Sequence, residues 1–148
     1  MSTIKMVRTI KEIHPDYVAL FLEGAFYKAY QKDAYIISAL FGYKTKIAGE
    51  VTSCGFPKSI IKRVQSKLED EKINYLLIDP RNQYHVDEKN DNGNLNTYSE
   101  KYQKSRDKVS KWNKIRNIEQ RLEERIDEKD FKNLIRKLED VLDEAGEV

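Results

Sequence analysis

The sequence predicts an α/β (α+β) protein, in which a small mixed β-sheet is flanked by helices and is followed by a C-terminal helical hairpin or one long helix. Two short segments rich in β-forming apolar residues, 17–24 and 73–79, are typical of buried strands. Before, between and after them, apolar residues recur every three or four positions, which is the spacing of amphipathic helices. Helices that alternate with strands in this way indicate layers around a sheet.

The N-terminal segment predicts a helix and then a strand. Residues 3–13 carry apolar side chains at helical spacing, namely Ile4, Val7 and Ile10. Pro15 should end this helix, because a residue before a proline is pushed away from helical geometry. Residues 17–24 then form the first buried strand, which a glycine closes.

A second helix is expected over residues 25–42, where Gly42 supplies the C-terminal cap. Its apolar positions step by three or four residues: Tyr27, Tyr30, Ala34, Ile37 and Phe41. On this interpretation Tyr27 belongs to the core. Residues 43–55 contain threonine, valine and two glycines, and we expect them to form one or two small strands with a turn.

A third helix is expected after residue 56, with Pro57 in its first turn, where proline is tolerated. Its apolar stripe comprises Ile60, Ile61, Val64 and Leu68. After the strand at 73–79 we expect a weak strand at 83–86, and then an Asn-rich segment that forms a loop or linker. We therefore expect three parts: an α/β domain over residues 1–86, a loop or linker over 87–96 and a helical tail over 97–146.

The tail carries two apolar stripes at helical spacing. The first comprises Val109, Trp112, Ile115, Ile118, Leu122 and Ile126, and the second comprises Phe131, Leu134, Ile135, Leu138, Val141 and Leu142. Residues 127–130, between them, form either a tight turn between two helices or a slip in one long helix. Because isolated helices are marginal in water, these stripes must pack on the first 80 residues, on each other as a hairpin, or on another copy.

Composition restricts the class of protein. Hydrophobic residues make up 39% and charged residues 35% of the chain, and no stretch has the apolar character of a membrane span or a secretory signal. The single cysteine, Cys54, excludes an internal disulfide and fits a reducing compartment, so we expect a cytoplasmic protein with no membrane partner. One cysteine and two histidines cannot form the usual structural zinc site.

Charge is unevenly distributed, although the net charge is only +2. Residues 98–116 hold seven basic and two acidic side chains, whereas residues 117–148 hold six basic and eleven acidic ones. The basic segment could bind phosphates, or its charge could be balanced by the acidic segment beside it. The tail is also a candidate for self-association, or for binding a protein partner, through residues 98–142.

No catalytic arrangement is recognisable in the sequence. The chain has no phosphate-binding loop of the Gly-x-x-x-x-Gly-Lys-Ser/Thr type and no Ser/His/Asp, Cys/His or metal-nuclease cluster. Cys54 is interpreted as a small buried residue, and His14 as a structural residue at a helix end. Asp79 lacks a second carboxylate at a fixed spacing. We therefore expect no enzymatic activity, no catalytic residue, no metal and no cofactor.

Three blocks in the first 80 residues resemble the N-terminal, mismatch-recognition domain of the mismatch-repair ATPase MutS. "HPDYVALFLEGAFYKAYQKDA", residues 14–34, is similar to the opening of that domain, where Gly-x-Phe-Tyr follows an apolar strand. "YKTK", residues 43–46, is similar to a strand that ends in Thr-Lys. "CGFPKSIIKRVQSKLEDEKINYLLID", residues 54–79, resembles a Gly-aliphatic-Pro block that leads a helix and then a strand. The resemblance implies the same fold.

In this family the Phe of a Phe-x-Glu motif stacks on a mispaired base, and the Glu forms a hydrogen bond with it. Phe26 occupies the Phe position here, and Lys28 occupies the Glu position. A lysine attracts phosphate but removes the hydrogen-bond acceptor. The resemblance therefore implies a nucleic-acid surface at Phe26 without implying selectivity for mispairs. The alternative is that Phe26 packs into the sheet.

The candidate nucleic-acid-binding residues combine this aromatic wedge with basic side chains: Phe26, Lys28, Lys44, Lys46, Lys58, Lys62 and Arg63. The basic residues could form one phosphate-binding face, or each could be an ordinary solvated side chain. The predicted function is non-catalytic nucleic-acid binding, with DNA favoured over RNA, by an accessory protein of a DNA-repair or retroelement reverse-transcriptase system. The alternative is a protein-interaction or oligomerisation module that has lost nucleic-acid binding.

Overall fold

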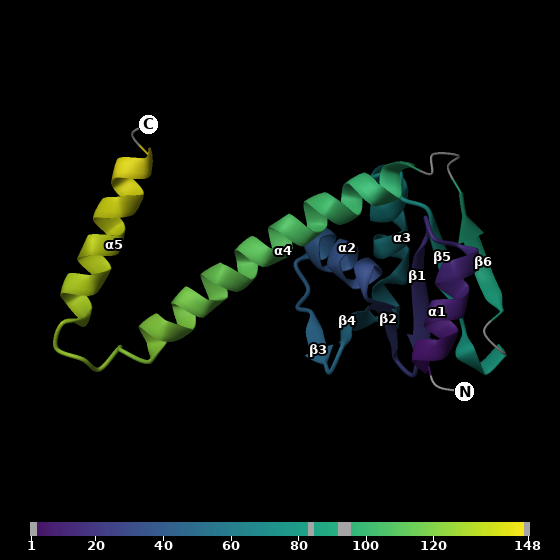
Figure 1. Ribbon diagram of the computed structural model, residues 1–148, viewed down its shortest axis with the longest axis horizontal. Helices are drawn as coiled ribbons and strands as arrows, with labels where there is room; N and C mark the ends of the chain where they lie inside the picture. Colours follow the sequence, from purple (N-terminus) through teal and green to yellow (C-terminus); the bar gives the residue numbers. More distant parts are fainter. Residues whose placement is uncertain (1–2, 83–84, 92–95, 147–148) are drawn as a thin grey trace. The chain divides into compact units, whose positions relative to one another are not determined.

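A computed structural model describes residues 3–82, 85–91 and 96–146 (Figure 1). The chain divides into two units, one that extends to Val109 and one that begins at Ser110. The first unit contains all six strands and the candidate site residues. The second contains the end of one helix and the whole of the next.

The first unit is built on a six-stranded mixed sheet with the strand order β3-β4-β2-β1-β5-β6. Its strands are β1 (Val18–Glu23), β2 (Phe26–Tyr30), β3 (Lys46–Ala48), β4 (Val51–Pro57), β5 (Tyr75–Ile78) and β6 (Val86–Asn90). Strands β1 and β5 are parallel, and the other neighbouring pairs are antiparallel. A mixed sheet flanked by helices is the predicted fold class, which the structure confirms.

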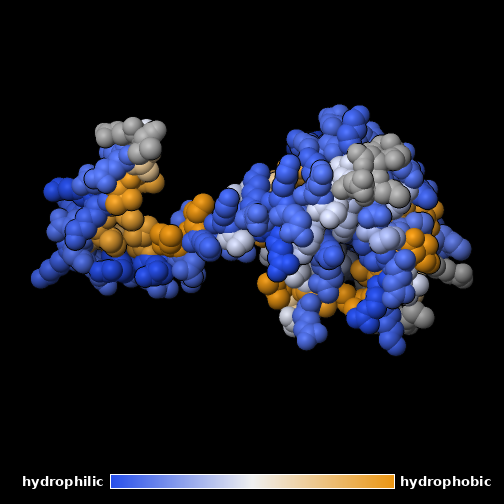
Figure 2. Space-filling view, turned by 45° about the horizontal axis from the view of Figure 1, so that its top comes forward, coloured by the Kyte–Doolittle hydropathy of each residue, from blue (hydrophilic) through white to orange (hydrophobic). Residues whose placement is uncertain are grey.

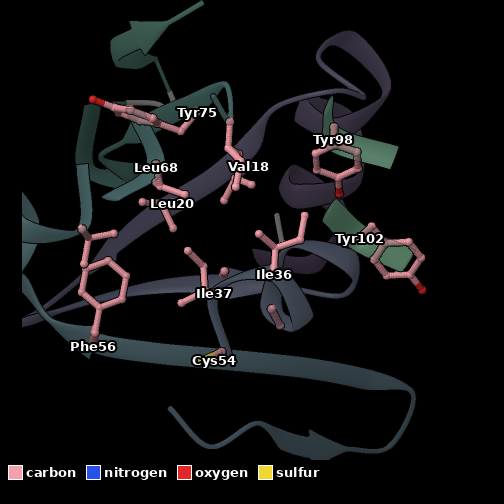
Figure 3. Packing of buried hydrophobic residues seen from close by; sticks show 14 of the residues in the cluster. Val18, Leu20, Ile36, Ile37, Cys54, Phe56, Leu68, Tyr75, Tyr98 and Tyr102 are labelled. Carbon is pink, nitrogen blue, oxygen red and sulfur yellow. The ribbon is translucent and has the colours of Figure 1, made fainter. Parts of the chain in front are cut away.

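Helices cover both faces of the sheet (Figure 1). The first face carries α2 (Lys32–Phe41) and α3 (Ile61–Asp70), and the second carries α1 (Thr3–Ile13). Alternate residues of β1 serve the two cores, because successive strand residues point to opposite faces. Val18 and Leu20 pack on the first face (Figure 3), whereas Ala19 and Phe21 pack on the second.

Helix α4 (Asn96–Glu123) begins as part of the first unit. Its tyrosines Tyr98 and Tyr102 join the core of the first face (Figure 3), and Val109 is also buried. The first part of the tail, up to Val109, therefore packs on the first 80 residues, which was one of the three alternatives. The unit that carries the sheet thus extends well beyond residue 86, where the sequence placed the domain end.

A buried carboxylate joins four elements of the first unit. Asp33, in the first turn of α2, is 1% exposed and accepts a hydrogen bond from the Ala19 amide of β1 at 3.0 Å. It also accepts a bond from the Tyr98 hydroxyl of α4 at 2.5 Å and pairs with Lys11 of α1 at 3.0 Å. Burial and the Asp33 charge raise the pKa of Tyr98, so the hydroxyl keeps its proton and remains a donor.

The helix predicted over residues 25–42 is wrong in its first part, because residues 26–30 form strand β2. Gly24 and Ala25 make a two-residue turn, so β2 pairs with β1 on one side and with β4 on the other. Tyr27 stacks on Phe56 of the first-face core, as a core residue would, while Tyr30 points to the opposite face. The helix itself begins at residue 32 and ends at Gly42, whose left-handed conformation confirms the predicted cap.

Other boundaries also differ from expectation. Pro57 is the last residue of β4 rather than part of a helix, and a short 3-10 turn, Lys58–Ile60, separates it from α3. Of the one or two small strands expected at 43–55, two form: β3 lies within that segment, and β4 begins in it and extends to Pro57. Strand β6 extends into residues predicted as linker, and its backbone pairs with β5 at the sheet edge. Of the weak strand expected at 83–86, residues 83 and 84 lie outside the described residues.

The tail is two helices rather than one long helix. Helix α4 ends at Glu123 and α5 (Phe131–Gly146) follows, so residues 127–130 lie in the connection between them. Arg125 holds that connection through Glu128 and Asp130, each at 2.9 Å. No helix in the described part of the chain carries an apolar run long enough to cross a membrane.

Candidate nucleic-acid interface

Phe26 is displayed at the end of the β1–β2 hairpin. It is the first residue of β2, directly after the turn in which Gly24 has a φ of +64°. That backbone conformation favours glycine, which explains the residue at the turn. The Lys58 amide donates to the Ala25 carbonyl at 2.8 Å and so fixes the turn to the end of β4. The Phe26 side chain is 47% exposed, so the sheet buries only part of it.

Lys28 lies on the same face of the sheet as Phe26, because the two residues are two positions apart in one strand. Gly55 of β4 is its ladder partner. A Cβ atom added to Gly55 would lie 3.5 Å from the Lys28 Cγ atom, so the lysine stem runs over the bare glycine. Lys28 is half-buried along this stem, which lets its ammonium group reach beyond the strand.

The strand register places two more residues beside Phe26. Glu23 is its partner on β1 and Pro57 is its partner on β4. These side chains, with Lys28 and Gly55, form an open area on the second face of the sheet, where Phe26, Gly55 and Pro57 are exposed. We call these five residues the hairpin patch: Glu23, Phe26, Lys28, Gly55 and Pro57.

Glu23 was missed in the sequence. Its carboxylate accepts a hydrogen bond from the Tyr30 hydroxyl, and the Tyr30 ring in turn packs edge-on against Phe21 at 5.9 Å. A carboxylate from β1 thus lies beside Phe26, whereas a lysine, Lys28, follows Phe26 on the same face of β2. The two-residue turn could have revealed it, because such a turn makes the residues on either side of it directly opposite partners.

The remaining candidate residues do not all share the face of Phe26. Lys46 of β3 pairs with Ser53, which pairs with Tyr30, so Lys46 belongs to the second face at the outer edge of the sheet. Lys62 and Arg63 lie on α3, which covers the first face. Arg63 donates to the Tyr43 hydroxyl at 2.9 Å.

The basic residues therefore divide into two groups rather than forming one surface. Lys28 and Lys46 belong to the second face with Phe26, whereas Lys62 and Arg63 belong to the helix on the first face. Lys58 lies between them, where β4 passes into the 3-10 turn. Lys44 is exposed in the segment between α2 and β3. A ligand that contacts both groups must pass around an edge of the sheet.

A hollow of about 320 Å³ opens on the second face between α1 and the junction of β2 with α2. Its lining is largely apolar but includes three basic side chains. The lining residues are Ile4, Val7, Arg8, Lys11, Glu12, Tyr30, Gln31 and Lys32. Gln31 has a φ of +55°, and its side chain accepts from the Thr52 amide at 3.0 Å. Arg8 of α1 is exposed and adds positive charge to the side of the sheet that carries Lys28, whereas the Lys32 ammonium group lies over the Tyr102 ring, 5.2 Å from its centroid.

The other titratable residues considered from the sequence are tied into the structure. Cys54 is 1% exposed, and burial raises the pKa of its thiol to about 11. His14 packs edge-on against Tyr17, and burial lowers its pKa. Asp79 pairs with Arg81 at 2.7 Å. Within the residues that the structure describes, no group of three or more histidine, cysteine, aspartate or glutamate side chains could hold a metal ion.

Comparison with protein families matches residues 2–75 to the model described as MutS domain I. This is half of the 148-residue chain and runs from α1 to the start of β5. It therefore includes Phe26, Lys28 and the ladder that holds them. A comparison with curated proteins finds no match.

Proposed function

Since the chain belongs to the MutS domain I family, whose domain recognises mismatched DNA, we propose that its first unit is a non-catalytic nucleic-acid-binding module that uses the hairpin patch. The exposure of Phe26 carries this proposal. A large aromatic ring at a strand start, 47% exposed and at the family's stacking position, is placed to meet a flat ligand. A nucleic-acid base is such a ligand, because every base has a π-face.

Phe26 inserts into a base step or stacks on an unpaired base. Inserted apolar side chains unstack a duplex step at a cost of a few kcal/mol, which the contacts of the bent duplex offset. Stacking on an aromatic side chain contributes roughly 1–3 kcal/mol per base on single strands. The hydrogen bond from Lys58 to Ala25 holds the turn that displays the ring, so little further ordering is required on binding.

Lys28 and Glu23 flank the ring with opposite charges. Lys28, which replaces the family's Glu, contacts a phosphate near the stacked base, since its stem is laid over Gly55 and a lysine that buries its stem keeps its ammonium group in water. Glu23 supplies the acceptor that Lys28 has removed, and the Tyr30 hydroxyl orients its carboxylate. On this account, the carboxylate that reads a base edge comes from β1 rather than from β2.

The other basic residues hold the nucleic-acid backbone on both sides of the wedge. Lys46 extends the second-face group, and Lys44, Lys58, Lys62 and Arg63 contact phosphates that pass around the sheet edge. DNA is the proposed ligand because of the family, and RNA is tested beside it. By analogy with the family's role, such a module would act as an accessory protein in the cytoplasm. It would belong to a DNA-repair or retroelement reverse-transcriptase system.

The experiment is fluorescence anisotropy with four labelled probes: matched duplex DNA, mismatched duplex DNA, single-stranded DNA and single-stranded RNA. Phe26→Ala should weaken binding of the preferred probe by roughly 5- to 150-fold, the equivalent of 1–3 kcal/mol. Ile47→Ala is the matched control, because Ile47 is a 71% exposed apolar residue of β3 that faces away from the patch. Its affinity should equal that of the wild type.

Two further variants separate charge from recognition. Lys28→Gln should weaken all probes similarly and should reduce the salt dependence of binding, because one phosphate contact is lost. Glu23→Gln should change the ratio of mismatched to matched affinity, while leaving the salt dependence nearly unchanged. If none of the four probes binds at low salt, the nucleic-acid proposal is refuted.

The second candidate function is a protein-interaction or oligomerisation module. The observation that favours it lies in the second unit, where Ile126 is 61% and Leu142 is 70% exposed. Apolar side chains gathered in this way mark interaction sites. The two functions can coexist, because one uses the hairpin patch and the other uses the tail.

A further inference from the structure

Helix α5 leaves the last part of its apolar stripe exposed, and the rest only half-buried, inside the unit to which it belongs. No residue of α5 is buried, and Val141 and Leu142 are 61% and 70% exposed. Figure 2 shows the resulting continuous hydrophobic strip along the second unit. The stripe repeats at three- and four-residue steps over the length of the helix: Phe131, Leu134, Ile135, Leu138, Val141, Leu142 and Ala145. A stripe of this width is typical of a helix that packs in a bundle.

The end of α4 covers α5 only in part. A hollow of about 240 Å³ remains between the two helices, and Ile118, Leu122, Leu134 and Leu138 contribute to its lining. Ile115 and Ile118 of α4 are themselves 53% and 49% exposed. A helix pair that leaves these apolar residues exposed requires further apolar surface to bury them.

The apolar positions of α5 are symmetric about Leu138. Three residues away on either side stand Ile135 and Val141, and four residues away stand Leu134 and Leu142. Seven residues away the pair is Phe131 and Ala145, which combines a large side chain with a small one. The stripe therefore presents the same pattern when the helix is read from either end.

The charged positions of α5 are antisymmetric about the same residue, except that Asp143 is matched by the uncharged Asn133. One residue away, Lys137 is matched by Glu139, and two residues away, Arg136 is matched by Asp140. Six residues away, Lys132 is matched by Glu144. Each basic residue in the first half of the helix thus has an acidic counterpart at the same distance in the second half.

We propose that α5 pairs antiparallel with α5 of a second copy of this chain, about a two-fold axis that passes at Leu138. Antiparallel pairing places the two apolar stripes face to face and lays the basic first half of each α5 beside the acidic second half of its partner. Parallel pairing would place Lys132 near Lys132 and Glu144 near Glu144, which costs energy through repulsion. The pattern therefore selects both the partner and its direction.

The end of α4 completes this interface. A 16-residue helix is about 24 Å long, and a pair of helices that short is marginal on its own. With the exposed Ile115 and Ile118 of each α4, two copies supply four helical segments around one apolar core. This inference does not depend on nucleic-acid binding, because it uses residues outside the hairpin patch.

The mass of the full chain in solution is the first test. Sedimentation equilibrium should give twice the chain mass of 17.4 kDa at micromolar concentration. A variant with Lys132→Glu and Lys137→Glu makes both halves of α5 acidic, so its dimer dissociation constant should rise at least about tenfold at low salt. A variant with Lys62→Glu and Lys104→Glu carries the same charge change outside the second unit and should remain dimeric. The proposal is overturned if the wild-type chain stays monomeric at 100 µM. That concentration is about 100-fold above a micromolar dissociation constant, so a dimer of that affinity would predominate.

Cysteine crosslinking tests the direction of the pair. Mild oxidation of mixed Leu134→Cys and Leu142→Cys chains should join one variant to the other, because an antiparallel pair brings these two positions of the apolar stripe level. Leu134→Cys alone should form little crosslinked dimer. Efficient crosslinking of Leu134→Cys to itself would show a parallel pair and would overturn the axis at Leu138. The native Cys54 should not interfere, because it is 1% exposed.

Discussion

Asp33→Ala should be among the most damaging single substitutions in the first unit. The carboxylate accepts the Ala19 amide, the Tyr98 hydroxyl and the Lys11 ammonium group, and it is 1% exposed. Alanine leaves the amide and the hydroxyl buried without an acceptor. Each orphaned donor costs roughly 1–3 kcal/mol, because its desolvation is no longer compensated.

The ion pair between Asp33 and Lys11 contributes less to the expected loss of stability than the burial of Asp33 suggests. Loss of one partner of a fully buried pair costs roughly 3–5 kcal/mol, because a charge remains in the interior. The Lys11 side chain, however, is 21% exposed and can turn toward water when its partner is removed. We therefore take the two orphaned donors as the main contribution, and expect Asp33→Ala to lower the free energy of unfolding by about 2–6 kcal/mol.

Urea unfolding followed by circular dichroism measures this change. Asp70→Ala, at the exposed end of α3, is the matched control and should change stability by less than about 0.5 kcal/mol. Tyr98→Phe should cost roughly 1 kcal/mol, since it removes one donor and keeps the ring packed. If Asp33→Ala unfolds within about 1 kcal/mol of the wild type, a value typical of an ordinary substitution, the argument from orphaned donors fails.

Two further predictions follow from the pKa shifts. Burial raises the pKa of Cys54 to about 11, so its thiol stays protonated at neutral pH, and a thiol-specific chromogenic reagent at pH 8 should react far more slowly with the native chain than with the urea-unfolded chain. Lys101 lowers the pKa of Glu71, so this pair stabilises the fold above the ordinary glutamate pKa, and the stability is lost as the pH falls through the lowered value. Lys101→Met should therefore flatten the acid limb of a plot of melting temperature against pH, and an unchanged limb would contradict the assignment.

Local patterns in the sequence were sufficient where one element decides its own structure. Helix α1, strands β1 and β5 and the cap at Gly42 follow from periodicity and from backbone preference. Strand β2 could not be predicted in this way, because Tyr27 and Tyr30 also fit a helical stripe. Its pairing with both β1 and β4 overrides that local signal, and only the turn at Gly24 hinted at it.

Strand β6 and the partner of Phe26 were missed for a related reason. The residues of β6, Val86–Asn90, are mostly charged, because an edge strand contributes backbone hydrogen bonds and little core. Glu23 became a candidate only when the register placed it opposite Phe26. The candidate lysines were identifiable as basic residues, but their division between two faces depends on the order of strands in the sheet.

The hydrogen bond from the Ala19 amide to Asp33 makes one backbone proton a reporter of the whole first unit. This amide can exchange with solvent only when the start of α2 moves away from β1. Because Asp33 also binds α1 and α4, that opening disturbs three helices and the sheet together. Hydrogen–deuterium exchange at Ala19 should therefore be as slow as global unfolding allows, while amides in loops exchange through local fluctuations.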